Sequence, residues 1–77
     1  MIMTEFRGIT TGKTIITKNN MNNIMVDNKI EIDDNNGETK IVGIVKDVVH
    51  LISKWRNNQG LERSTHDIII DVEDKTL

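Results

Sequence analysis

The sequence predicts an α+β fold: a small antiparallel β-sheet of about four to five strands with one amphipathic helix packed on one face. Three observations lead to this. Runs rich in isoleucine and threonine or with alternating apolar residues recur at 13–18, 29–32 and 66–73. Apolar residues repeat at spacings of three and four over 44–57. The length of 77 residues allows one small domain, 1–77.

The first strands and their turns are read from local patterns. Residues 13–18, KTIITK, favour an extended strand. In KIEI, 29–32, the two isoleucines alternate with charged residues, which is typical of a half-buried strand. We expect NIMV, 23–26, to pair with it through a tight turn at 27–28. DDNNG, 33–37, is the strongest turn signal in the chain.

The next segment allows two interpretations. Residues 38–58 form either one long helix or a strand followed by a helix. Because Gly43 would cost about 1 kcal/mol inside a helix, we expect a strand to about Val42 and a helix over 44–57. Its apolar stripe consists of Ile44, Val45, Val48, Leu51, Ile52 and Trp55. This stripe favours a core position for Trp55, and Gly60 suits the C-terminal cap.

The last strand is predicted over 66–73, with Ile68, Ile70 and Val72 on one face. Residues 74–77 are expected to be a frayed tail.

Composition bounds the class of protein. Cysteine is absent, which excludes disulfides and thiolate metal sites. We find neither a membrane-spanning apolar run nor a signal peptide, so we expect a cytoplasmic protein. The 13 Ile and 9 Asn, with no Ala or Pro, indicate an AT-rich source such as a phage or another mobile element. A small aliphatic core favours a homo-oligomer.

The stretch GITTGKT, 8–14, invites comparison with a nucleotide-binding P-loop. That motif needs four residues between its glycines, and Gly8 and Gly12 are separated by three. The residues that follow are β-branched and do not open a helix. We therefore interpret the stretch as a turn between two short strands.

Catalysis and metal binding are not predicted. His50 and His66 lack neighbouring ligands in a suitable pattern. Ser53 and Ser64 are the only serines, and the position of Ser64 two residues from His66 in an expected loop does not by itself indicate a nucleophile held by a base. We expect no enzyme activity, no metal and no cofactor.

Two binding surfaces remain. The leading hypothesis is a phage or mobile-element protein that inhibits or sequesters a host defence factor through an acidic protein interface. That interface consists of Asp27, Glu31, Asp33, Asp34 and Glu38. The alternative is an oligomeric sponge that binds a phosphorylated signalling nucleotide between protomers. Its residues are Arg7, Thr11, Lys13, Lys54, Trp55 and Arg56.

In the alternative, Trp55 is exposed and stacks on a base instead of closing the core. A third class is a structural or housekeeping interaction module. The net charge of −2 argues against non-specific nucleic-acid binding.

Overall fold

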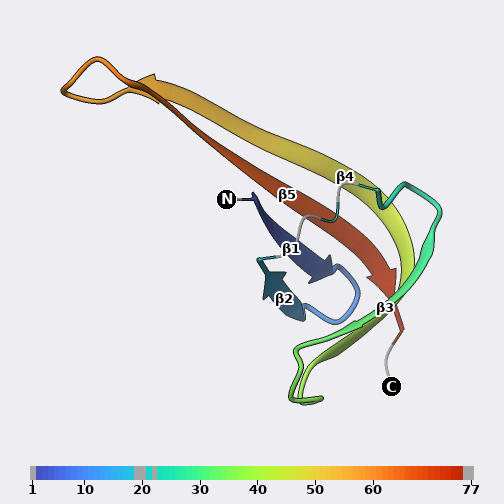
Figure 1. Cartoon of the computed structure of the whole chain (residues 1–77). Helices are drawn as coiled ribbons and strands as arrows, with labels where there is room; N and C mark the ends of the chain where they lie inside the picture. Colours follow the sequence, from blue (N-terminus) through green and yellow to red (C-terminus); the bar gives the residue numbers. More distant parts are fainter. Residues whose placement is uncertain (1, 19–20, 22, 76–77) are drawn as a thin grey trace.

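Five β-strands make up the regular structure of the chain in a computed structural model that describes residues 2–18, 21 and 23–75 (Figure 1). The strands are β1 (Ile2–Gly8), β2 (Thr14–Thr17), β3 (Lys29–Asp33), β4 (Lys40–Arg56) and β5 (Glu62–Asp74). They form a sheet with the strand order β2-β1-β5-β4-β3. The fold of the described residues is therefore all-β, and the predicted α+β class is wrong. None of them forms a helix long and apolar enough to span a bilayer.

The sheet is mixed rather than purely antiparallel. β1 pairs with β2, β3 with β4 and β4 with β5 in antiparallel fashion. β1 and β5 run parallel, with Phe6 beside Ile70. The expectation of an antiparallel sheet is thus wrong for this central pair, which joins segments from the two ends of the chain.

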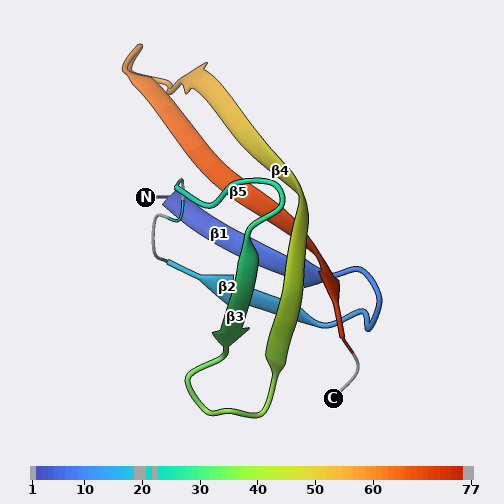
Figure 2. The ribbon, with the colours of Figure 1, turned by 90° about the vertical axis from the view of Figure 1, so that its right-hand side faces the viewer.

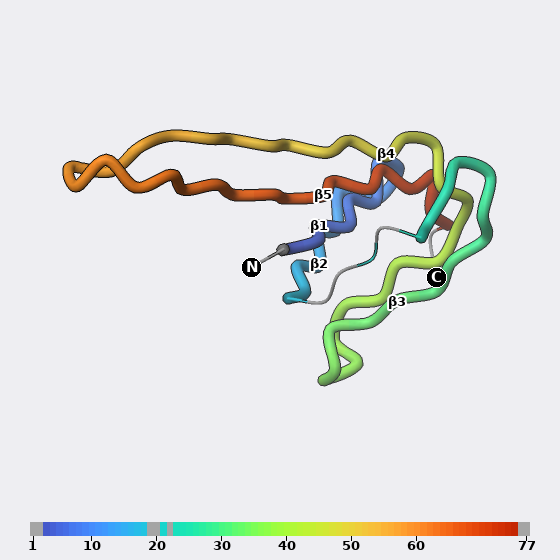
Figure 3. Tube along the Cα trace, turned by 45° about the horizontal axis from the view of Figure 1, so that its top comes forward, coloured from blue at the N-terminus to red at the C-terminus, as the bar shows by residue number. Residues whose placement is uncertain are grey.

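The sheet curls into an incomplete barrel. β3 and the first half of β4 cross over β1 and β2 (Figures 2 and 3). A bulge between Val45 and Asp47 interrupts the β4–β5 register, and bulges increase the local bend of a strand. The enclosed core consists of Phe6, Ile15, Ile41, Val45, Ile68, Ile70 and Val72. Met21, Ile24, Ile30, Ile32 and Val48 pack against it.

The predicted helix over 44–57 is wrong, because β4 continues through these residues to Arg56. Alternation places Val48 and Ile52 on one face of β4, and Leu51 and Trp55 on the other. Both faces of β4 carry apolar residues, and the bulge shifts the alternation by one residue. Apolar residues therefore recur at sequence spacings of three and four, as they would along one face of a helix. The β-branched residues of this segment favour the strand.

Other local predictions have mixed outcomes. The strands predicted at 29–32 and 66–73 are confirmed within β3 and β5, and the strand predicted at 13–18 is confirmed over the residues of β2. Residues 33–37 do form a turn, with positive φ at Asn35 (72°) and Gly37 (75°).

The predicted hairpin at 23–28 is wrong, because the described residues of 23–26 form no strand and β3 pairs with β4 instead. The backbone N–H of Asp27 donates to the carbonyl of Val45, 2.8 Å away. Gly60 lies in the turn between β4 and β5, not at the end of a helix. The last residues of the predicted frayed tail, 76–77, lie outside the described residues, whereas Asp74 at its start is buried at the end of β5.

The far halves of β4 and β5 project from the barrel as a two-stranded ribbon (Figure 1). β1 begins at Ile2, whose register partner is His66, and among the described residues no other strand pairs with the ribbon beyond that point. We call residues 52–66 the arm. The arm makes the molecule elongated, with principal extents of 50 × 26 × 19 Å.

Candidate functional site

The six predicted ligand-binding residues fall into two distant groups. Arg7, Thr11 and Lys13 belong to the barrel, whereas Lys54, Trp55 and Arg56 lie near the tip of the arm. In the register, Arg7 is beside Asp71 and Trp55 is beside Arg63. These partners are eight positions apart along β5, a span of roughly 26 Å at about 3.3 Å per residue. A single protomer does not bring the two groups together.

The turn formed by residues 9–13 binds a carboxylate of the same chain, that of Asp74. The Asp74 carboxylate accepts hydrogen bonds from the backbone N–H groups of Thr10 (3.0 Å) and Thr11 (3.2 Å). It also accepts one from the Thr11 hydroxyl, whose oxygen accepts from the N–H of Lys13 at 3.3 Å. The interpretation as a turn between two short strands is confirmed. Thr11 is therefore committed to Asp74 within the chain.

Asp74 is only 4% exposed, and its environment favours the charged form. Burial alone would raise its pKa, but the hydrogen bonds from the Thr11 hydroxyl and from the two backbone N–H groups hold the pKa of Asp74 below its usual value. A Cβ at Gly8 would overlap this carboxylate. The glycine thus makes room for the buried anion.

Arg7 and Lys13, the two cations of the predicted barrel group, also have partners in the chain. The guanidinium Nε of Arg7 donates to Glu5 Oε2 at 2.6 Å. The ammonium group of Lys13 donates to the backbone carbonyl of Lys40 at 3.5 Å. The geometry of the barrel gives these predicted residues structural contacts.

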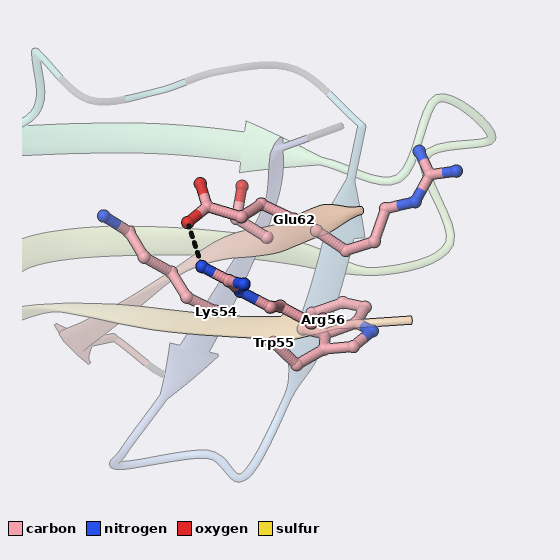
Figure 4. Close-up of a pocket in the computed structure, with 6 residues that line it drawn as sticks. Lys54, Trp55, Arg56 and Glu62 are labelled. Carbon is pink, nitrogen blue, oxygen red and sulfur yellow. Dashed lines mark ion pairs between the residues drawn. The ribbon is translucent and has the colours of Figure 1, made fainter. Parts of the chain in front are cut away.

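The arm tip gathers the remaining predicted residues around a shallow concavity of about 460 Å³ (Figure 4). Its lining consists of Lys54, Trp55, Arg56, Glu62, Arg63 and Ser64. Arg56 and Glu62 form an exposed ion pair at 4.0 Å. Trp55 is 47% exposed, so the core position favoured by the helical stripe is wrong. Sequence reasoning missed Glu62 and Ser64, because only β-pairing brings them beside Lys54 and Arg56.

The acidic residues predicted as a protein interface lie around β3 and the β3–β4 turn. Asp34 accepts hydrogen bonds from the N–H groups of Asn36, Glu38 and Thr39 at 3.1–3.2 Å. Asp33 accepts one from Asn35 at 3.0 Å. The side chains of Asp33 and Asp34 thus stabilise the turn.

The other acids of this set have different surroundings. Glu31 pairs with Lys40 at 2.6 Å, and both the hydrogen bond and the charge of Glu31 raise the pKa of Lys40. Asp27 is exposed at a turn with a φ of 74°. Turn chemistry and local pairing therefore account for much of this acidic surface without a partner.

We expect Asp34→Ala to lower the free energy of unfolding by about 1–2 kcal/mol, because three N–H groups lose their acceptor. Urea unfolding followed by circular dichroism measures the change. Glu38→Ala removes a neighbouring exposed charge and is expected to leave stability nearly unchanged. Equal losses in both variants would contradict a turn-stabilising role for Asp34.

A second concavity, of about 290 Å³, lies on the outer face of the sheet, opposite the core. We call it the outer groove; its lining includes Met3, Glu5, Arg7, Ile16, Leu51, Asp67 and Ile69. Its floor is apolar, and two carboxylates and one guanidinium surround it. Sequence reasoning missed this groove because it placed Leu51 on a helix.

Two histidines meet on the inner face of the ribbon, the face that continues from the core. Nδ1 of His50 and Nε2 of His66 are 2.8 Å apart. Sequence reasoning did not bring them together, because it placed His50 on a helix. The described residues contain no cluster of three or more His, Cys, Asp or Glu suited to a metal ion. The expected lack of a metal site stays a prediction.

Comparisons with known proteins do not connect this arrangement of residues with a known family. No protein-family model matches the sequence, and neither the curated proteins nor the solved structures gave a significant match.

Proposed function

We propose that the protein is a non-catalytic interaction module that binds a partner protein through its arm. The observation that supports this is the exposure of apolar side chains on a ribbon with which no further strand pairs in the described part of the chain. Ile52 is 60% exposed, Leu61 52% and Trp55 47%. An isolated two-stranded ribbon is marginally stable in water, and exposed apolar clusters mark interaction surfaces.

The arm suits this role better than the acidic surface around the β3–β4 turn. Asp33 and Asp34 use their carboxylates inside that turn, and Glu31 is paired with Lys40. By contrast, the arm combines an exposed tryptophan with cations, and tryptophan and arginine are the residues most enriched in binding hot spots. The partner class we propose is a host protein, because the abundance of Ile and Asn without Ala or Pro suits an AT-rich source such as a phage or another mobile element.

Photo-crosslinking in the cells that carry the gene tests this proposal. A benzophenone amino acid replaces Ile52 on the inner face of the arm or, as a control, Ile9 in a barrel turn, which is 56% exposed. We expect a covalent adduct with a second protein from position 52 and none from position 9. No adduct from position 52, or the same adduct from both positions, would overturn the proposal.

A second candidate function is capture of a phosphorylated nucleotide at the arm tip. Lys54, Arg56 and Arg63 line one concavity together with Trp55, and cations beside an indole suit a phosphate and a stacked base. Lys54 and Arg56 reach it from the inner face of the ribbon, and Trp55 and Arg63 from the outer face. Titration calorimetry with a cyclic dinucleotide as probe tests it. We expect Lys54→Ala to weaken binding roughly tenfold and Lys18→Ala, a distant exposed lysine, to leave it unchanged.

Failure of the cyclic dinucleotide to bind would remove this candidate. If neither crosslinking nor titration finds a partner, the third class remains: a structural or housekeeping module.

A further inference from the structure

The outer face of the ribbon carries a regular row of side chains on each strand. On β4 these are Val49, Leu51, Ser53 and Trp55, and along β5 and the turn before it they are Leu61, Arg63, Thr65, Asp67 and Ile69. Alternation places the residues of these rows that belong to β4 and β5 on the face opposite the buried Ile68 and Ile70, and Leu61 precedes the β5 row in the turn. Ser53 and Thr65 are register partners midway along this face.

The β5 row is self-complementary about Thr65. Two positions away on either side stand Arg63 and Asp67, which carry opposite charges. Four positions away stand Leu61 and Ile69, which are both apolar. A second row, turned end for end and laid on the first, therefore places each charge against its opposite and each apolar residue against another.

The β4 row repeats the relation about Ser53. Two positions away stand Leu51 and Trp55, which are 49% and 47% exposed. When a second β4 row is laid on the first in the reverse direction, the indole of Trp55 meets the side chain of Leu51 at both ends. Both strands thus share one centre, the Ser53–Thr65 pair, where the side chains are small and polar.

A surface of this kind is complementary to a second copy of itself related by a two-fold axis, because an isologous interface uses the same patch on both subunits. With the axis at the Ser53–Thr65 pair and perpendicular to the strands, two arms face each other in antiparallel orientation. Arg63 then opposes the partner's Asp67, and Trp55 opposes the partner's Leu51. Two sheets pack face to face at about 10 Å, a distance that these side chains span.

We propose that a second copy of the chain packs on the outer face of the arm, related by a two-fold axis at Ser53–Thr65. This inference rests on the proposed function, because it takes the arm as the protein-binding element. It assigns Trp55 and Leu61 on the outer face to self-association and leaves Ile52, Lys54 and Arg56 on the inner face for the partner protein. The outer groove continues the same face at the base of the arm, where the partner's arm tip arrives.

A reciprocal charge swap tests the axis. Arg63 and Asp67 lie four positions apart on one strand, about 13 Å, so they do not meet within a protomer. Arg63→Asp and Asp67→Arg each place like charges together in the dimer, and we expect either variant to weaken dimerisation roughly tenfold or more. The double variant restores opposite charges across the axis, and we expect it to recover dimerisation to within about threefold of the native protein.

Sedimentation velocity from about 1 to 100 µM gives the dissociation constants. The single tryptophan supplies a second signal, because dilution of the dimer exposes Trp55 and shifts its fluorescence to the red. Lys29→Glu, a charge reversal at an exposed position of β3, is the matched control and is expected to dimerise normally. Circular dichroism confirms that each variant is folded.

The outcomes separate this inference from the proposed function. A native protein that is monomeric at about 100 µM, or a double variant without recovery, overturns the two-fold arm dimer. If crosslinking from position 52 still captures a second protein, the proposed function survives that result. A dimer that obeys the charge swap without any adduct from position 52 supports the inference and removes the separate partner.

Discussion

Replacement of Gly43 by alanine is expected to lower the free energy of unfolding by about 3 kcal/mol. A Cβ at this position would overlap the Glu73 carbonyl oxygen and lie 2.7 Å from Cα of Asp74. Both are backbone atoms of the paired strand β5, so no side-chain rotation relieves the overlap. The strands must separate where β4 bends, and the hydrogen bond from Lys75 N–H to the Val42 carbonyl, 2.9 Å, is strained with them.

The same substitution distinguishes the two folds that the sequence allows. At the start of a helix over 44–57, Gly43→Ala would stabilise the chain by up to about 1 kcal/mol. In β4 it destabilises the chain, so the sign of the change reports the fold. Urea unfolding measures it.

Gly37→Ala is the matched control. Gly37 has a φ of 75° and open space around it, so alanine there costs only about 1 kcal/mol of left-handed backbone strain. An unfolding free energy of Gly43→Ala at or above the native value would contradict the close approach of β4 and β5.

Sequence reasoning succeeds where structure is decided locally. The isoleucines of β3 alternate with charged residues, and in β5 the apolar Ile68, Ile70 and Val72 occupy every second position. Residues 33–37 combine aspartate, asparagine and glycine, whose side chains and permitted φ values build a turn without tertiary help. These elements were predictable because their patterns match the period of the structure that they form.

The helix prediction fails because β4 violates a regular period. The bulge at Val45 and Asp47 inserts one residue, and it moves each later residue to the opposite face. A ribbon with apolar residues on both faces then shows no clean alternation. Only the partner strand β5 fixes the register, and the local sequence does not display that partner.

The candidate site was predictable in pieces. Lys54, Trp55 and Arg56 stand out in the sequence as cations flanking a tryptophan, and they do share one concavity. The cluster is completed by Glu62 and Arg63 through the β4–β5 pairing. The parallel pairing of β1 with β5 is equally non-local. Because this pairing ends at His66, it defines where the arm begins, and the local sequence does not display it.

Asp74→Asn is expected to lower the free energy of unfolding by about 2 kcal/mol at neutral pH, because a buried carboxylate loses charge-assisted hydrogen bonds. The variant keeps the shape of the side chain, so lost charge rather than a cavity causes the change. The turn over residues 9–13 is expected to loosen first, and amide hydrogen exchange at Thr10 and Thr11 reports it.

The pH dependence of this difference tests the cause. The pKa of Asp74 is lower in the folded protein than the unfolded value of about 3.9. Its contribution is therefore fully present above that unfolded pKa and is lost as pH falls through the folded one. The stability gap between the native protein and Asp74→Asn should stay constant from about pH 7 to 5 and shrink below about pH 4. Asp27→Asn, at an exposed turn, should show no such gap, and a gap for Asp74→Asn that persists in acid would mean that shape, not charge, holds the turn.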